Sequence, residues 1–275
     1  MDNVTRTFRN VGIGSYEPYL SFALGAGDTT VTKMVNAYAA LANNGLQFPS
    51  TLIDYVQDRN GKVIWRADGR RCVGCNLAEW DGKPMPRFES RGKQVMDAGT
   101  AFQVVHMLTG VVQRGTAVVL RDLDLPLFGK TGTTSGPTNV WFVGGSQKYV
   151  AGVYLGFDQP RSLGGYAQGG TFAAPIFKQF VAATKARWTH TPFIAPAGIR
   201  MVKIDRMSGK RVTGADPGKD PKAAIIWEAF KPDTEPRRKT AVDDFVAKRD
   251  ALIAEIRRAR NPPKAAAHDE TVAVE

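Results

Sequence analysis

Residues 129–134 read Gly-Lys-Thr-Gly-Thr-Thr, and the fold prediction for this chain of 275 residues starts from them. Short apolar runs rich in Val, Tyr and Phe surround this stretch, at residues 125–133, 140–144 and 149–157. Gly and polar residues separate the runs, as they do between strands that follow one another through short turns. The pattern therefore predicts an antiparallel meander of three strands, with the quoted stretch on the first of them.

Helical spacing marks three segments around this meander. Apolar residues recur at helical intervals through residues 34–42, with a Thr upstream as a cap and an Asn-Gly pair after them as a stop. A second helix is expected from Asp97, its cap, to Arg114, and a third over residues 173–187, where Pro175 is tolerated in the first turn. Together with the meander, these helices predict an α+β fold, an antiparallel sheet with packed helices.

Weaker patterns describe the N-terminal half. Residues 1–29 are Gly-rich and are expected to be irregular. Two short strands are expected at residues 51–56 and 62–65, joined through the Arg-Asn-Gly turn of residues 59–61. Gly, Pro, Cys and charged residues without periodicity follow, so a loop excursion is expected at about residues 66–95.

The C-terminal part is predicted to be a separate extension. The expected regions are a main domain at residues 1–190, a small extension with a β-hairpin at 191–230, and a charged, largely disordered tail at 231–275. The hairpin is expected to pair residues 199–204 with residues 210–213. A linker rich in Pro and charge should follow over residues 214–240, and residues 241–260 have helical propensity.

The charge of the chain is positive but dispersed. Lys and Arg number 37 against 26 Asp and Glu, which gives a formal net charge of +11. Residues 231–275 are nearly neutral, with ten basic and nine acidic residues, so the excess is spread over the rest. Nucleic-acid binders usually concentrate charge on one face, so no nucleic-acid partner is expected. No apolar run reaches about 18 residues and no signal-like segment opens the chain, so neither a transmembrane helix nor a signal peptide is expected.

The quoted stretch and the Trp-Phe-Val-Gly of residues 141–144 together resemble the third active-site motif of penicillin-binding proteins and serine β-lactamases. A bare Lys-Thr-Gly occurs in many unrelated chains, where it is an ordinary strand end with a Gly bulge. Five further segments resemble class A penicillin-binding proteins of the 1a type in the same order, at residues 20–30, 38–45, 111–117, 156–161 and 169–177. The chain up to about residue 213 is therefore identified as a member of this family, as the C-terminal part of its transpeptidase domain.

The resemblance implies a site on this strand that binds an extended peptide. An edge strand offers free backbone N–H and C=O groups to such a peptide, and Gly132 leaves room for close approach. The hydroxyls of Thr131 and Thr133 are expected to donate to a substrate carboxylate, which the charge of Lys130 attracts. In the family, the backbone N–H at the position of Thr133 forms half of the oxyanion hole.

The resemblance also implies an activity and a location. Complete members are peptidoglycan D,D-transpeptidases that act through an acyl-enzyme, with peptidoglycan stem peptides as substrates and β-lactams as acylating ligands. They also carry a glycosyltransferase domain and an anchor that holds them at the periplasmic face of the inner membrane. Neither is visible in this sequence, so the N-terminal part is expected to be missing, and any membrane attachment would come from it. No cofactor is expected.

The nucleophile of the family is expected outside this chain. It lies in a Ser-x-x-Lys motif, assisted by a Ser-x-Asn, and both precede Lys-Thr-Gly. No Ser-x-Asn occurs here, and the single formal Ser-x-x-Lys, from Ser90 to Lys93, lies in a Pro- and Gly-rich stretch instead of opening an apolar helix. Ser90 is therefore interpreted as a solvated loop residue, and the chain alone should be inactive. The alternatives are a non-catalytic binding module and a small hydrolase that uses Ser90.

Cysteine and histidine give no clear metal site. Cys72 and Cys75 could be half of a zinc site, a redox pair or a local disulfide, and two loop thiols able to pair in an oxidising compartment are the favoured interpretation. Zinc needs two more ligands, and the only histidines, His106, His190 and His268, are scattered. His106 falls among apolar helical positions, so we expect a core or boundary histidine and predict no metal.

Overall fold

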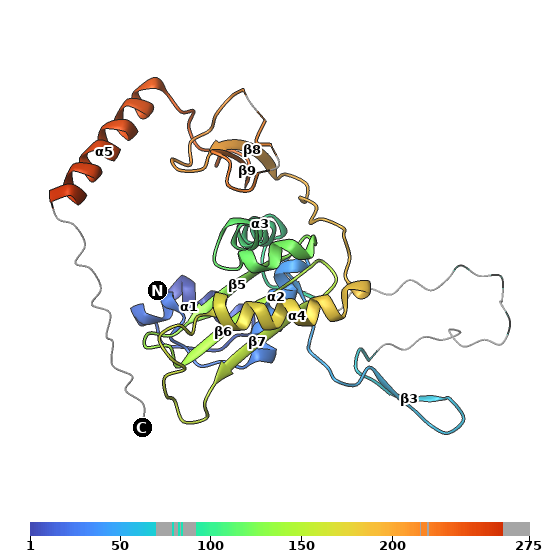
Figure 1. Cartoon of the computed structure of the whole chain (residues 1–275). Coiled ribbons are helices and arrows are strands. Elements are labelled where there is room, and N and C mark those ends of the chain that lie inside the picture. Colours follow the sequence, from blue (N-terminus) through green and yellow to red (C-terminus); the bar gives the residue numbers. More distant parts are fainter. Residues whose placement is uncertain are drawn as a thin grey trace, which may run out of the picture.

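A three-stranded antiparallel sheet lies at the centre of the computed structural model, which describes residues 1–69, 79, 82, 84, 92–214, 216–218 and 220–260 (Figure 1). Its strands are β5 (Phe128–Thr133), β6 (Asn139–Gly145) and β7 (Val150–Gly156), in the order β5-β6-β7. The predicted meander is thus confirmed. Both β5 and β7 are edges of this sheet, because among the described strands each of them pairs only with β6.

Helix α4 (Ala174–Ala183) covers one face of this sheet. Phe142 from β6 and Phe177 from α4 are both fully buried, with ring centroids 4.7 Å apart. A π-helical turn, η3 (Gly169–Ala173), leads directly into α4. The third expected helix is therefore present but shorter than predicted, and a separate 3₁₀ turn, η4 (Lys185–Arg187), follows it.

Helix α2 (Val31–Ala42) covers the other face. Val35 lies over Gly152 of β7, which pairs with Val143 of β6. Successive residues of a strand face opposite sides, so this side is opposite to the one that holds Phe142. The threonine that the sequence predicts as the cap of α2 accepts a hydrogen bond from a backbone N–H in the first turn (3.3 Å), which confirms the start of the helix.

Helix α3 (Ala98–Arg114) begins and ends where the sequence predicts. The carboxylate of Asp97 caps it by accepting a hydrogen bond from the backbone N–H of Thr100 (2.9 Å). A 3₁₀ turn, η2 (Val118–Leu123), follows, and its Leu120 is buried in the same core as α4. No local pattern in the sequence predicts this turn, because burial against α4 stabilises it and local propensity does not.

The strands β8 (Arg200–Asp205) and β9 (Ile225–Phe230) form a second antiparallel sheet. This pairing corrects the expected hairpin: β8 pairs along its length with β9, residues 210–213 contribute only isolated bridges from Arg211 to Ile204 and to Arg238, and the expected linker of residues 214–240 contains β9. The prediction is wrong because the Pro and charged residues around β9 obscure an apolar and aromatic run with strong strand propensity.

Polar side chains along α3 hold this second sheet. The Gln103 amide donates to the carbonyl oxygen of Ala229 (2.9 Å), and His106 Nε2 lies 3.0 Å from the carbonyl oxygen of Trp227. Alternate residues of a strand present their carbonyl groups at the same edge. Helix α3 therefore supplies hydrogen-bond partners to one edge of β9, which is a tertiary contact that the local sequence does not reveal.

Helix α1 (Asp2–Asn10) occupies part of the N-terminal segment that is expected to be irregular. That prediction is wrong because the glycines on which it depends begin only at Gly12. Asp2 lies in the first turn of α1 and Arg9 in the last turn, where each complements the helix dipole. A 3₁₀ turn, η1 (Leu20–Leu24), comes later in the same segment.

The hairpin expected near residue 60 is present. It pairs β2 (Tyr55–Gln57) with β3 (Val63–Arg66), and its first strand is shorter than predicted. A short ladder of β1 (Leu46–Gln47) with β4 (Lys93–Gln94) closes the base of the expected loop excursion. Most of the excursion itself lies outside the described residues.

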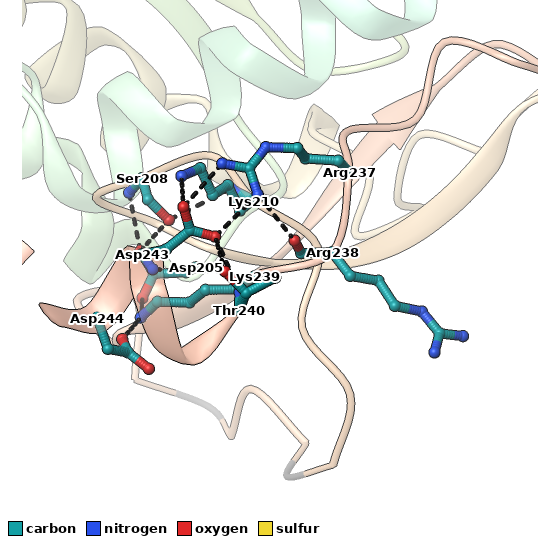
Figure 2. A network of polar contacts seen from close by, with 9 residues as sticks. All are labelled: Asp205, Ser208, Lys210, Arg237, Arg238, Lys239, Thr240, Asp243 and Asp244. Atoms are coloured by element: carbon teal, nitrogen blue, oxygen red, sulfur yellow. Dashed lines mark hydrogen bonds and ion pairs between the residues drawn. The ribbon is translucent and has the colours of Figure 1, made fainter. Parts of the chain in front are cut away.

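Helix α5 (Ala241–Arg260) is anchored to the second sheet by the polar network in Figure 2. Asp243 lies at its centre. The Asp243 carboxylate accepts hydrogen bonds from the guanidinium of Arg237 (2.7 and 2.9 Å), from the backbone N–H of Thr240 (2.9 Å) and from the ammonium of Lys210. The start of α5 is thus capped by its own aspartate and tied to the turn after β8.

Lys239 makes a second branch of this network. Its Nζ lies 3.1 Å from the carboxylate of Asp205 and 2.7 Å from that of Asp244. Asp205 also accepts a hydrogen bond from the Ser208 hydroxyl (2.7 Å), and these two donors lower the pKa of Asp205 to about 2. The hydrogen bonds from its guanidinium and ammonium partners hold the pKa of Asp243 far below its usual range.

The network gives regular structure to part of the expected tail. Residues 241–260 are helical, where a largely disordered tail is expected over residues 231–275, and residues 261–275 lie outside the described part. The division of the chain at residues 190 and 230 stays a prediction. Within the described ranges, no helix combines the length and the apolar character that a membrane span needs.

Phe177→Ala should destabilise the chain, because it leaves a cavity beside Phe142 in the core. We expect a loss of about 3–5 kcal/mol in the free energy of unfolding, measured by urea unfolding followed by far-UV circular dichroism. Phe180→Ala, on the same helix at a residue that is 50% exposed, is the matched control and should cost much less. Equal losses in the two variants would contradict this packing.

Acid should loosen the attachment of α5 and β9. A carboxylate whose pKa is lowered by folding stabilises the folded state fully above its unfolded pKa of about 3.9, and this stabilisation is lost as the pH falls through the folded pKa. The folded pKa of Asp205 is about 2, and a hydrogen bond from Lys231 lowers that of Asp97 to about 2 as well. Hydrogen-exchange protection of α5 and β9 should therefore decrease between about pH 4 and pH 2.

Two variants test the source of this effect. Asp243→Asn removes the charge at the centre of the network, so α5 should already be poorly protected at pH 5. Asp250→Asn, in the exposed middle of the helix, should behave like the unchanged chain. Protection that falls already between pH 7 and pH 5 in the unchanged chain would contradict the assignment to these aspartates.

Candidate active site

The four residues expected to form the site lie on the open edge strand β5: Lys130, Thr131, Gly132 and Thr133. The cross-strand pairs show which way each residue faces. Lys130 pairs with Val143, on the side of α2, and Thr131 pairs with Phe142, on the side of α4. Because neighbours alternate along a strand, Lys130 and Gly132 share one face and the two threonines share the other.

Lys130 stands beside a cavity of about 660 Å³ on the α2 side of the sheet. The walls of this cavity come from α2, the loop before it, β6 and β7, and they include Tyr16, Asp28, Met34, Tyr38, Trp141 and Tyr154. Burial raises the pKa of Tyr38 to about 12, so the Tyr38 side chain stays uncharged. Lys130 Nζ donates to the carbonyl oxygen of Thr131 (2.8 Å), and no carboxylate of the described residues forms an ion pair with it. A lysine that forms no ion pair has its positive charge available for an anion that enters the cavity.

The threonine hydroxyls of β5 are each held by a distant segment. Thr131 Oγ1 lies 2.7 Å from Thr116 Oγ1, in the connection between α3 and η2. Thr133 Oγ1 accepts a hydrogen bond from the backbone N–H of Gly169 (3.0 Å), the first residue of η3. The end of α3 and the start of η3 therefore meet at the open end of β5.

Gly169 lies too close to the sheet for any side chain. A Cβ at this position would lie 2.5 Å from the carbonyl oxygen of Trp141 and 2.7 Å from that of Gly132. Both are backbone atoms of paired strands, which cannot move aside without disturbing the sheet. At Gly132 itself, a Cβ would lie 3.2 Å from the Cβ of Trp141, so this glycine is tightly packed on the α2 side.

Sequence reasoning did not identify Thr116 and Gly169 as site residues. Both lie in segments that stand out only through their resemblance to a family, residues 111–117 and 169–177. The paired glycines that open the second segment are a general sign of close backbone approach, and this sign could have indicated the contact. Nothing local marks Thr116, whose partner is 15 residues away on another element.

The remaining candidates lie elsewhere. Four of them are outside the described residues: Cys72, Cys75, Ser90 and His268. His106 stacks on Phe102 (6.0 Å between ring centroids) and contacts β9, so it is a boundary histidine. His106 and the exposed His190 both line a second cavity of about 860 Å³, beside α3 and β9. In the described part of the chain, no group of three or more His, Cys, Asp or Glu residues is arranged to hold a metal.

Comparison with known proteins relates these features to a family. Residues 8–182 match the family model described as the penicillin binding protein transpeptidase domain. Penicillin-binding protein 1A of Rickettsia prowazekii is 35% identical over 215 residues, which is 77% of this chain and 26% of that protein. Penicillin-binding protein 1A of Pseudomonas aeruginosa is 32% identical over 251 residues, 78% of this chain and 29% of that protein. The chain thus spans about a quarter of the length of these curated relatives.

A solved structure has the same fold. The crystal structure of penicillin-binding protein 1A from Haemophilus influenzae is 24% identical and matches 85% of this chain and 37% of that chain, at a TM-score of 0.65. The likeness confirms the predicted α+β fold, an antiparallel sheet with packed helices of the penicillin-binding protein type. Because the family model covers more than half of the chain and includes the whole of β5, the chain belongs to the penicillin-binding protein transpeptidase family.

Proposed function

We propose that this chain is the carboxylate-binding part of a serine-type peptidoglycan D,D-transpeptidase, a class A penicillin-binding protein. The observation that carries the proposal is the open edge of β5, where Lys130 has no counter-ion among the described residues and faces a cavity. Family membership and the names of the relatives support the same conclusion.

The edge of β5 suits the D-Ala-D-Ala end of a peptidoglycan stem peptide. Such a peptide would lie beside β5 as an added strand and use its free backbone groups. The ammonium of Lys130 and the hydroxyls of Thr131 and Thr133 would then bind the terminal carboxylate through charge-assisted hydrogen bonds. The backbone N–H of Thr133 would donate to the oxygen of the scissile carbonyl, and one such donor contributes about 3–4 kcal/mol to transition-state stabilisation.

The covalent step requires a serine that we place outside this sequence. In acyl-enzyme chemistry the serine attacks the carbonyl of the penultimate residue, the terminal D-Ala leaves, and the amine of a second stem peptide then takes the acyl group. The sequence has no Ser-x-Asn and only one formal Ser-x-x-Lys, at Ser90. The chain alone should therefore be inactive, and β-lactams would acylate the external serine with their carboxylate held at β5.

The substrate also suggests where the protein works. Peptidoglycan is cross-linked at the outer face of the inner membrane, so we place the complete protein there, on the periplasmic side. An anchor outside this sequence would hold it, and a glycosyltransferase domain would accompany it as in other class A members. Neither nucleic acid nor a cofactor takes part in this function.

One observation favours a second candidate function. Because the sequence offers no Ser-x-Asn, the chain could be a binding module that keeps the carboxylate-binding edge and performs no chemistry. Such a module would bind stem peptides reversibly and would never form an acyl-enzyme. The two functions share the properties of β5 and differ only in whether a serine of the same polypeptide reaches the bound peptide.

Lys130→Met should remove the preference of the chain for a carboxylate, because Met keeps much of the length of the side chain but not its charge. The unchanged chain should bind N-acetyl-D-Ala-D-Ala more tightly than the C-terminal amide of the same peptide in an NMR titration. The variant should lose about tenfold or more in affinity for the carboxylate form, as expected when a hydrogen bond to a charged group is removed.

Lys148→Met is the matched control for this experiment. Lys148 is also exposed, but it lies in the turn between β6 and β7, with its ammonium over the ring of Tyr149 (5.5 Å). This variant should bind both peptides as the unchanged chain does. Equal affinity of the unchanged chain for the two peptides would contradict a carboxylate site on β5.

Fluorescent penicillin should distinguish the transpeptidase from the binding module. Membranes of cells that produce the protein would be labelled, separated on a denaturing gel and probed with an antibody against residues 241–260. A labelled, antibody-reactive band much larger than 29.9 kDa is expected for the transpeptidase. An unlabelled band near 29.9 kDa would support the module instead. A labelled band of that size, lost in Ser90→Ala, would show a small hydrolase.

A further inference from the structure

Thr116 and Gly169 belong to segments that have no role in the proposed function, yet each holds a hydroxyl of β5. The two segments also contact each other. A Cβ at Gly170 would lie 2.5 Å from the carbonyl oxygen of Thr116, so the paired glycines let η3 approach both β5 and the end of α3. The end of α3, the start of η3 and the end of β5 therefore form one closely packed corner.

The hydrogen bond from Gly169 restricts the directions in which the Thr133 hydroxyl can donate. A hydroxyl has one proton to donate and two lone pairs that accept. One lone pair of Thr133 Oγ1 is occupied by the N–H of Gly169, so the proton points away from Gly169. Thr133 is exposed, and its hydroxyl donates no hydrogen bond to any of the described residues. The hydroxyl can thus donate its proton to a ligand while it accepts from Gly169.

Thr116 acts on Thr131 in a similar way. Their oxygens are 2.7 Å apart, so one hydroxyl donates to the other, and the accepting hydroxyl keeps its own proton for another partner. A carboxylate at the edge of β5 accepts hydrogen bonds and has no proton to donate. It therefore selects the arrangement in which Thr116 donates to Thr131 and Thr131 turns its proton to the anion.

We propose that Gly169 and Thr116 are positioning residues for the carboxylate of the substrate. They do not touch it, and they turn the protons of Thr133 and Thr131 toward it. This inference rests on the proposed function of β5. It adds that recognition of a carboxylate depends on a main-chain N–H and a side chain that lie outside the Lys-Thr-Gly stretch.

The amide proton of Gly169 should report this arrangement. When Thr133 donates to a carboxylate, its oxygen becomes a better acceptor, because linked hydrogen bonds polarise one another. The NMR signal of the Gly169 amide proton should therefore move downfield when N-acetyl-D-Ala-D-Ala binds to the isotope-labelled chain, and move less when the C-terminal amide binds. In Thr133→Val, which has no hydroxyl, this difference should disappear.

Thr116→Val should weaken binding of the carboxylate peptide by about 2- to 10-fold, the size of one neutral hydrogen bond, and leave binding of the amide peptide nearly unchanged. Thr116→Ser keeps the hydroxyl and should restore the preference. Gly169→Ala should have a larger effect, because its Cβ pushes the N–H away from Thr133. Gly165→Ala is the control for this loop, since nothing lies within 4 Å of the added Cβ.

The outcomes separate this inference from the proposed function. If the unchanged chain prefers the carboxylate, but the Gly169 signal does not respond and Thr116→Val keeps the full preference, the inference is wrong and the proposed function stands. If the unchanged chain shows no preference, the proposed function fails and the inference fails with it. Should Gly169→Ala not fold, the Gly169 signal and the pair of Thr116 variants decide the matter.

Discussion

The packing of α4 against β6 determines the geometry at the edge of β5. Phe142 and Phe177 meet in a fully buried contact, so α4 has one position on the sheet. Because η3 runs directly into α4, this position also places Gly169 over the end of β5, at a distance that only glycine permits. The core contact between Phe142 and Phe177 thus determines the position from which the Gly169 N–H donates to the Thr133 hydroxyl.

Much of the fold could be predicted from the sequence, because local rules govern it. The meander follows from short apolar runs between turns, and the caps of α2 and α3 follow from a Thr and from Asp97. Where a tertiary contact determines the structure, the local sequence gives no sign of it or predicts a different structure. Strand β9 forms because β8 pairs with it and α3 supplies donors such as Gln103 to its edge. No pattern within residues 214–240 reveals either partner.

The candidate site also has a part that could be predicted from the sequence and a part that could not. The Lys-Thr-Gly-Thr stretch could be recognised, and its placement on an edge strand follows from the position of the first run in the meander. The residues that orient its hydroxyls could not, because Thr116 and Gly169 reach β5 from 15 and 36 residues away. Hydrogen bonds between distant segments depend on the whole packing, and a single sequence contains no direct record of them.

The alternation of side chains along β5 restricts where a ligand can lie. The Lys130 side chain faces α2, while those of Thr131 and Thr133 face α4, so a ligand lying flat on one face of the sheet does not meet all three side chains directly. A ligand in the plane of the sheet, beside the edge, is within reach of all three. That position is also the one an extended peptide takes when it pairs with an edge strand. In the proposed function, backbone pairing and binding of the carboxylate therefore require the same placement of the ligand, and a free carboxylate without an extended backbone would satisfy only half of this arrangement.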